Sequence, residues 1–161
     1  MSGRTAWLLM LVLVGGFGCG MRVPVPSGAA PGVPRVTWII MNGDRDNPDR
    51  EFVCQSDPRT ACEIPASRPD EQVFAHLYVY YHPAAVETVY TGSIRVGFFG
   101  ASPEIKPMIT VKPNEKLANQ TVMGLVSTMP GTFPVTFDIV ATPAGAGAGQ
   151  PVRDSVDVTV R

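Results

Sequence analysis

The ten residues 73–82, VFAHLYVYYH, decide the fold class. They are rich in aromatic and β-branched side chains and contain neither Gly nor Pro, which is typical of a β-strand. Alternation puts Val73, Ala75, Leu77, Val79 and Tyr81 on one face and Phe74, His76, Tyr78, Tyr80 and His82 on the other. We expect the first, largely aliphatic face to lie in a core and the second face to point outward.

Seven further runs of this kind, each bounded by turn residues, occur between residues 35 and 160. They cover residues 35–41, 50–55, 88–99, 107–112, 120–128, 133–141 and 152–160. No stretch keeps a helical periodicity over three turns. The sequence therefore predicts an all-β domain over residues 35–161, a single antiparallel β-sandwich of about seven to nine strands.

The C-terminal sequence refines this expectation. Pro-Gly-Thr-Phe at residues 130–133 precedes an alternating run, a Gly-rich segment at 142–151 and a final Val-x-Val-x-Val at 156–160. This order resembles the end of the immunoglobulin-like sandwich domains found on bacterial surfaces. The resemblance implies a fold and says little about function.

Composition excludes several classes of protein. Hydrophobic residues make up 45% of the 161 residues, which argues against a wholly disordered chain, and the 16 Gly and 16 Pro follow no collagen period. There are 13 Lys and Arg residues against 14 Asp and Glu residues. Because this balance leaves no basic excess, we expect no nucleic-acid partner.

The first 18 residues have the pattern of a signal peptide. Arg4 precedes the unbroken apolar run 6–14, AWLLMLVLV, and small residues follow it. The run is well short of the roughly 20 apolar residues that a membrane-spanning helix needs. The alternative is a buried N-terminal strand or helix, but the run shows no polar alternation and has no capping residue.

The residues Gly16-Phe17-Gly18-Cys19 resemble the lipobox of bacterial lipoproteins, with Gly16 standing where an aliphatic residue is usual. The resemblance implies cleavage before Cys19, a diacylglycerol on its thiol and an acylated amine. The partner at this end of the chain would be a membrane, held through the lipid. Gly20, in place of the Asp that retains many such proteins at the inner membrane, implies the outer membrane of a two-membrane bacterium, facing the periplasm or the surface.

With Cys19 assigned to lipid, Cys54 and Cys62 remain as a pair. The intervening Asp57-Pro58 favours a turn that brings them together, and a disulfide suits an exported protein. A metal site is the weaker alternative, because two thiolates lack two further ligands and have no neighbouring His. We expect no cofactor.

Residues 19–34, the lipidated Cys and the segment GMRVPVPSGAAPGVP, read as a flexible tether. Four prolines favour polyproline-like extension, and at about 3.1 Å per residue the tether could hold the domain up to roughly 45 Å from a membrane. The alternative is an edge segment that packs loosely on the domain.

The outward face of residues 73–82 is the best candidate for a ligand surface. Phe74, Tyr78 and Tyr80 could stack on sugar rings or receive a partner protein. Cross-strand neighbours such as Tyr90, or the tether, could equally cover them. His76 and His82, about 20 Å apart along the strand, are too distant to share one metal ion.

A weak calcium site is the other candidate. Asp44, Asp46 and Asp49 lie in the segment NGDRDNPD at 42–49, and clustered oxygen ligands suit Ca²⁺. Arg45 and Arg50 oppose a cation, and the alternative is a solvated turn. We expect no other metal site.

No common catalytic motif is present in the sequence, so we do not expect an enzyme. The favoured function is a non-catalytic envelope lipoprotein whose sandwich has a structural role or binds an envelope protein. The first alternative is a carbohydrate-binding module that uses the aromatic face. The second is a hydrolase with a carboxylate pair such as Glu87 and Asp138, which nothing in their spacing singles out.

Overall fold

The computed structural model describes residues 32–43, 51–65, 73–97, 104–113, 115, 119–127 and 130–161. This part of the chain forms ten strands and no helix. The strands are β1 (Arg35–Asn42), β2 (Glu51–Gln55), β3 (Cys62–Ile64), β4 (Val73–His82), β5 (Thr88–Val96), β6 (Glu104–Ile105), β7 (Met108–Val111), β8 (Asn119–Ser127), β9 (Gly131–Pro143) and β10 (Gln150–Val160).

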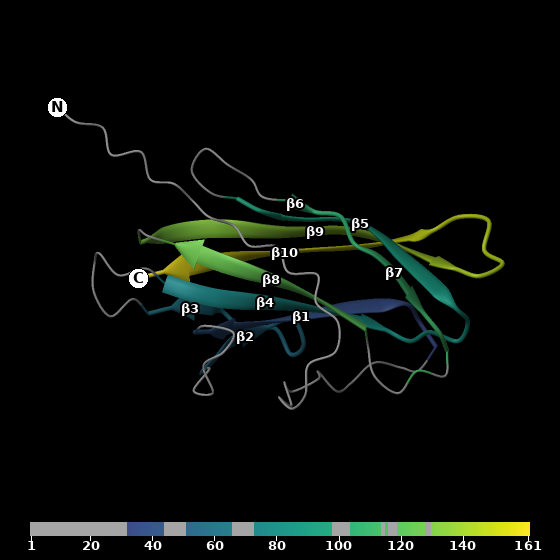
Figure 1. Cartoon of the computed structure of the whole chain (residues 1–161), viewed down its shortest axis with the longest axis horizontal. Coiled ribbons are helices and arrows are strands. Elements are labelled where there is room, and N and C mark those ends of the chain that lie inside the picture. Colours follow the sequence, from purple (N-terminus) through teal and green to yellow (C-terminus); the bar gives the residue numbers. More distant parts are fainter. Residues whose placement is uncertain are drawn as a thin grey trace.

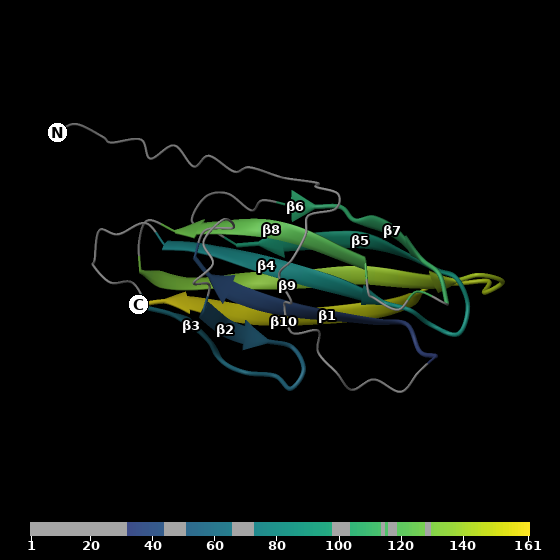
Figure 2. The ribbon, with the colours of Figure 1, turned by 60° about the horizontal axis from the view of Figure 1, so that its bottom comes forward.

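The strands form two sheets that stack as the layers of a β-sandwich (Figures 1 and 2). One sheet has the order β2-β1-β4-β8, and the other has the order β3-β10-β9-β5-β6, with β7 also pairing with β5. All pairs are antiparallel except β3 with β10. The predicted sandwich is confirmed, with two strands more than the eight runs in the sequence: β3 and β6, three and two residues long, are too short to show an alternating pattern.

The strand order follows the immunoglobulin-like arrangement. Strands β1, β4 and β8 are neighbours like strands A, B and E of such domains, and β5, β9 and β10 are neighbours like C, F and G. Two hallmarks of antibody domains are placed differently here, because the disulfide joins β2 to β3 and the buried Trp38 lies on β1. The likeness therefore concerns the arrangement of strands alone.

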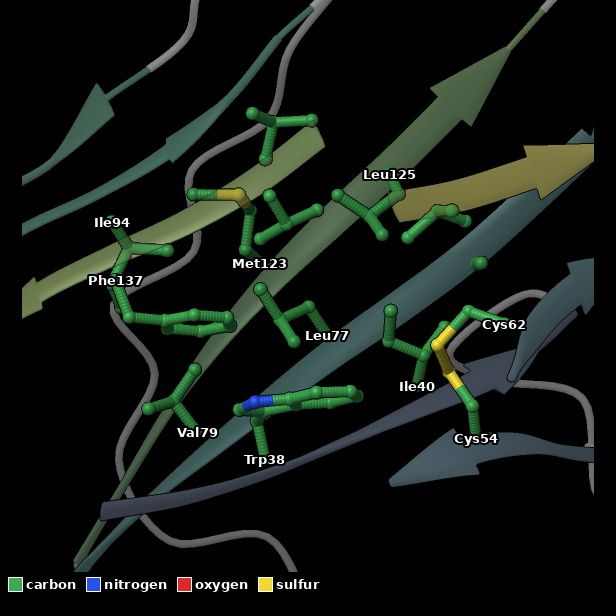
Figure 3. Close-up of a cluster of buried hydrophobic side chains, with 14 of the residues drawn as sticks. Trp38, Ile40, Cys54, Cys62, Leu77, Val79, Ile94, Met123, Leu125 and Phe137 are labelled. Carbon is green, nitrogen blue, oxygen red and sulfur yellow. A yellow bond between two sulfur atoms is a disulfide. The ribbon is translucent and has the colours of Figure 1, made fainter. Parts of the chain in front are cut away.

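The core fills the space between the two sheets, as Figure 3 shows. The predicted inward face of β4 is confirmed: Val73, Ala75, Leu77, Val79 and Tyr81 are all buried in this cluster. Trp38 of β1 stacks on Phe137 of β9, with ring centroids 5.8 Å apart and an interplanar angle of 6°. This offset aromatic contact across the layers adds to the stabilisation from buried area.

The predicted disulfide is present and crosses the sandwich. Cys54 lies on β2, an edge of the four-stranded sheet, and Cys62 lies on β3, an edge of the six-stranded sheet. Their Cα atoms are 5.1 Å apart. Both residues are buried, so the bond joins the two sheets from within the core at one side of the sandwich.

Close approach of β5 to β9 requires a glycine at position 92. Gly92 has a φ of +136°, and a Cβ placed there would lie 2.1 Å from the backbone oxygen of Asp138.

The Gly-rich turn between β9 and β10 is shorter than its sequence indicates, because β9 continues to Pro143 and β10 begins at Gln150. The turn is also tied to the domain, since Ala144 N donates to Glu87 O at 2.7 Å.

Candidate functional site

On the outer face of the four-stranded sheet the two tyrosines of β4 are buried, which agrees with the alternative of a covered aromatic face and not with an exposed one. Tyr78 is 6% exposed and Tyr80 is 3% exposed. They pack with Ile39 of β1 and with two partly buried neighbours, Met41 and Val122. Neither ring offers its surface to solvent, so a sugar could stack on these tyrosines only after the face opens. The side chain of Phe74 lies outside the described residues.

Tyr90 does not cover this face. It belongs to the other sheet and points into the core, where its ring centroid lies 5.4 Å from that of Tyr81. On the outer face, burial raises the pKa of Tyr80 above its ordinary range, and the neighbouring Tyr78 raises it further. The Tyr80 hydroxyl is buried and has no hydrogen-bond partner within the described part of the chain.

The two histidines take part in separate contacts at opposite ends of β4. His76 Nδ1 lies 3.1 Å from the carbonyl oxygen of Gly43. His82 Nε2 lies 2.7 Å from Thr37 Oγ1. The two side chains thus have different partners, and the described residues contain no cluster of three or more His, Cys, Asp or Glu side chains that could hold a metal ion.

A polar cluster around His82 fixes the start of β1. The Tyr90 hydroxyl donates to the His82 carbonyl at 2.7 Å and accepts from Arg35 N at 3.1 Å. The Arg35 guanidinium lies 3.1 Å from Asp57 Oδ2 as an ion pair without hydrogen-bond geometry. Burial lowers the pKa of His82, the positive charge of Arg35 lowers it further, and Asp57 opposes both.

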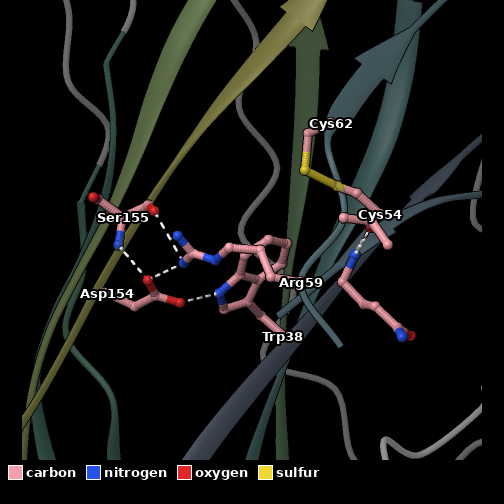
Figure 4. Close-up of a disulfide and its surroundings, with 8 residues drawn as sticks. Trp38, Cys54, Arg59, Cys62, Asp154 and Ser155 are labelled. Carbon is pink, nitrogen blue, oxygen red and sulfur yellow. Dashed lines mark hydrogen bonds and ion pairs between the residues drawn. A yellow bond between two sulfur atoms is a disulfide. The ribbon is translucent and has the colours of Figure 1, made fainter. Parts of the chain in front are cut away.

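A second polar cluster, shown in Figure 4, lies beside the disulfide. Trp38 Nε1 donates to Asp154 Oδ2 at 2.8 Å, and Arg59 forms an ion pair with the other carboxylate oxygen of Asp154. Arg59 also donates to the carbonyl of Ser155 at 3.2 Å. Asp154 thus satisfies the one polar atom of a core tryptophan and ties the loop between β2 and β3 to β10.

This polar cluster was not predicted from the sequence, although the sequence of β10 contains a signal for it. Asp154 occupies the face of β10 that also carries Val152, Val156 and Val158. An acidic residue on an otherwise apolar, inward face needs a donor within the fold. The indole of Trp38 and the guanidinium of Arg59 are those donors.

The outer face of the six-stranded sheet is polar. Arg153 donates to Asp138 at 3.0 Å, and Arg95 donates to Glu104 at 3.0 Å. The suggested acid pair is not brought together. Asp138 is opposite Ser93 and Thr88 is opposite Pro143, so Glu87 and Asp138 are separated by roughly 17 Å or more along the sheet. Asp138 is instead engaged by Arg153.

Several predicted residues lie outside the described part of the chain. They are Cys19, Asp44, Asp46 and Asp49, together with the signal peptide 1–18 and most of the tether. A search of the described residues finds no helix with the length and apolar character to cross a membrane. Comparison with known proteins gives no match, either to a family model or to a curated protein.

Proposed function

We propose that this chain is an exported bacterial lipoprotein, anchored to a membrane through lipidated Cys19. Its sandwich is a non-catalytic module that makes structural or protein contacts at the cell envelope. The observation that carries this proposal is the pairing of Cys54 with Cys62. Because two of the three cysteines bond to each other, Cys19 is left over, and it stands directly after a signal-like apolar run.

Two further observations support the proposal. A disulfide between the sheets is suited to an oxidising compartment outside the cytoplasm. Both histidines are held in contacts within the fold, and Glu87 and Asp138 are far apart, which leaves neither pair placed for acid–base chemistry. Anchoring through several acyl chains would be effectively permanent, since each buried methylene contributes roughly 0.8 kcal/mol.

Metabolic labelling with a fatty acid in a bacterial host tests the anchor. We expect the wild-type chain to incorporate the label and to fractionate with membranes, and Cys19→Ser to lose both properties. The matched control is the double variant Cys54→Ser/Cys62→Ser, which loses the disulfide and keeps the label. Label that persists in Cys19→Ser would refute the proposal. In-cell crosslinking of the anchored chain then identifies the envelope protein that it contacts.

A further inference from the structure

Strand β8 is the longest edge strand in the described part of the chain. It has nine residues and ends the four-stranded sheet, where it pairs with β4 along its whole length and with no described strand on its other side (Figures 1 and 2). In an antiparallel ladder, alternate residues direct their N–H and C=O groups to the same side of the strand. Alternate residues of β8 therefore direct these groups to an edge at which no described strand lies, and such a row of groups is a template for a further strand.

The other sheet edges carry features that hinder pairing with another chain. Strand β2 has five residues, includes Glu51 and shifts in register against β1. Strand β3 has three residues, of which Glu63 forms an ion pair with Arg161. Strands β6 and β7, at the far edge of the six-stranded sheet, have two and four residues, and β6 carries the charged Glu104. Short length, charged side chains and bulges are the means by which soluble proteins protect sheet edges.

Strand β8 has none of these features. Residues 117–130, LANQTVMGLVSTMP, contain no charged residue, and their one proline comes after the strand. Met123 and Leu125 are buried in the core between the sheets, and Val122 packs against the buried residues of the outer face. The side chains thus fix the strand on both faces of the sheet, and its backbone edge is the side without a described neighbour.

The place beside β8 is filled in domains of the immunoglobulin type. In their sheet of strands A, B, E and D, strand D pairs with strand E. Strand β8 takes the place of E here, whereas the fourth described strand of this sheet, β2, lies at the opposite edge next to β1. The position of strand D is therefore without a described strand, and a strand supplied from outside the domain would complete the arrangement.

We infer that β8 pairs with β8 of a second copy of this chain, in an antiparallel arrangement about a two-fold axis. The four-stranded sheets of the two copies then form one continuous sheet of eight strands, which is within the usual size of sheets. The inference rests on the proposed function in one respect, that the sandwich is a module for protein contacts, and it names the partner. It does not require the lipid at Cys19.

The sequence of β8 suits pairing with itself. Polar residues stand at both ends, Asn119, Gln120 and Thr121 at the start and Ser127 at the finish, and residues 122–126 between them are apolar or Gly. In an antiparallel pair the polar start of one strand meets the polar end of the other, and the two apolar middles meet. Because β8 has no charged side chain, no like charges oppose one another, which would be destabilising. Such a contact uses the same surface on both copies and closes at a dimer.

The register with the greatest overlap has its axis at Met123, the middle residue of β8. It places Gly124 opposite Val122 of the partner subunit, on the outer face of the sheet. Gly124 leaves room for this side chain, since a Cβ built on it would meet no atom within 4 Å. In the same register the two copies of residue 124 are diagonal neighbours, with Cα atoms about 7–8 Å apart. Gly124 is therefore a suitable position for a probe of the pairing.

Thiol crosslinking in cells tests this pairing in the full chain. Gly124→Cys is made in a Cys19→Ser background, so that the introduced thiol is the only one outside the Cys54–Cys62 disulfide. With a short bis-maleimide we expect a crosslinked dimer of the chain. The matched control is Thr136→Cys in the same background, at an exposed position on the outer face of the other sheet, which we expect to remain monomeric. Dimer yields that do not differ between the two variants, or a crosslink from position 124 to a different protein, would overturn the inference.

Charge variants at Val122 provide a second measurement. The two copies of residue 122 are also diagonal neighbours in this register, so Val122→Lys alone, or Val122→Glu alone, brings like charges together and should lower the dimer yield about tenfold. Co-expression of the two variants should restore the yield, because opposite charges then meet, and restoration shows that both chains are folded. Met108→Lys, at an 81% exposed position of β7 on the other sheet, is the matched control and should leave the yield unchanged. If Val122→Lys lowered the yield no more than Met108→Lys, or if co-expression restored nothing, pairing through β8 would be contradicted.

The outcome is separable from that of the lipid anchor. Every crosslinking variant has the Cys19→Ser background, so the dimer yield does not report on lipidation, and fatty-acid labelling of the wild-type chain does not report on pairing. A labelled chain that forms no dimer would keep the anchor and overturn the pairing through β8. A dimer formed by a chain that takes up no label would do the reverse.

Discussion

Replacing Asp154 by Ala removes the only acceptor shown for the indole N–H of Trp38 within the described residues. Trp38 is 1% exposed, and its Nε1 lies 2.8 Å from Asp154 Oδ2. A hydrogen bond to a charged group contributes about 1.5–3 kcal/mol, and leaving a buried donor unsatisfied costs a similar amount. We therefore expect Asp154→Ala to lower the free energy of unfolding by about 2 kcal/mol, or to lower Tm by about 4–8 °C.

Urea unfolding followed by fluorescence measures this effect directly. Trp7 and Trp38 are the two tryptophans, so in a Cys19→Ser chain that begins at residue 19 the signal comes from Trp38 alone. The matched control Asp157→Ala, at an exposed position of the same strand, should change stability by less than about 0.5 kcal/mol.

The ion pair to Arg59 should matter less than the indole hydrogen bond. Arg59 is 53% exposed, and pairs of this kind contribute at most about 1 kcal/mol. We expect Arg59→Ala to cost about half as much as Asp154→Ala or less. If Asp154→Ala were no worse than Asp157→Ala, or if Arg59→Ala were the more damaging change, the account of this cluster would be refuted.

Three further predictions concern the fold. Gly92→Ala should cost more than about 2 kcal/mol because of its close backbone contact and positive φ, whereas Gly124→Ala, with open space around its Cβ, should be nearly neutral in thermal unfolding. Reducing Cys54–Cys62 should lower the free energy of unfolding in urea by roughly 2.5 kcal/mol, as the loss of a nine-residue loop constraint predicts; an unchanged midpoint would contradict this. The pKa of His82 is lowered in the fold, so the unfolded chain binds a proton at this residue more readily than the folded chain does. The folded state is therefore destabilised as the pH falls below 6.5, the ordinary pKa of His, and this loss is absent at higher pH. In His82→Gln we expect Tm to depend less on pH below 6.5.

The parts of the fold that depend on local alternation were predictable. The inward face of β4 and the β9–β10 hairpin follow from a period of two in their side chains. The Cys54–Cys62 bond followed from cysteine arithmetic and a turn between the two residues. In each case neighbouring residues in the sequence carried the information.

The features that depend on distant contacts were not predictable in the same way. The sequence places Tyr78 and Tyr80 on the outer face of β4, but it does not say whether another layer covers that face. The contact of Trp38 with Asp154 spans 116 positions and joins opposite sheets. Short strands such as β3 take their place from pairing with β10, which no local pattern encodes.

The state of the three cysteines in protein extracted from membranes tests the central claim most directly. The measurement is the mass of the intact chain and of its alkylated peptides, before and after reduction. Our account predicts a chain that begins at a lipidated Cys19, with Cys54 and Cys62 inaccessible to alkylation until the disulfide is reduced. A chain that keeps residues 1–18 and carries an alkylatable Cys19 thiol would contradict it.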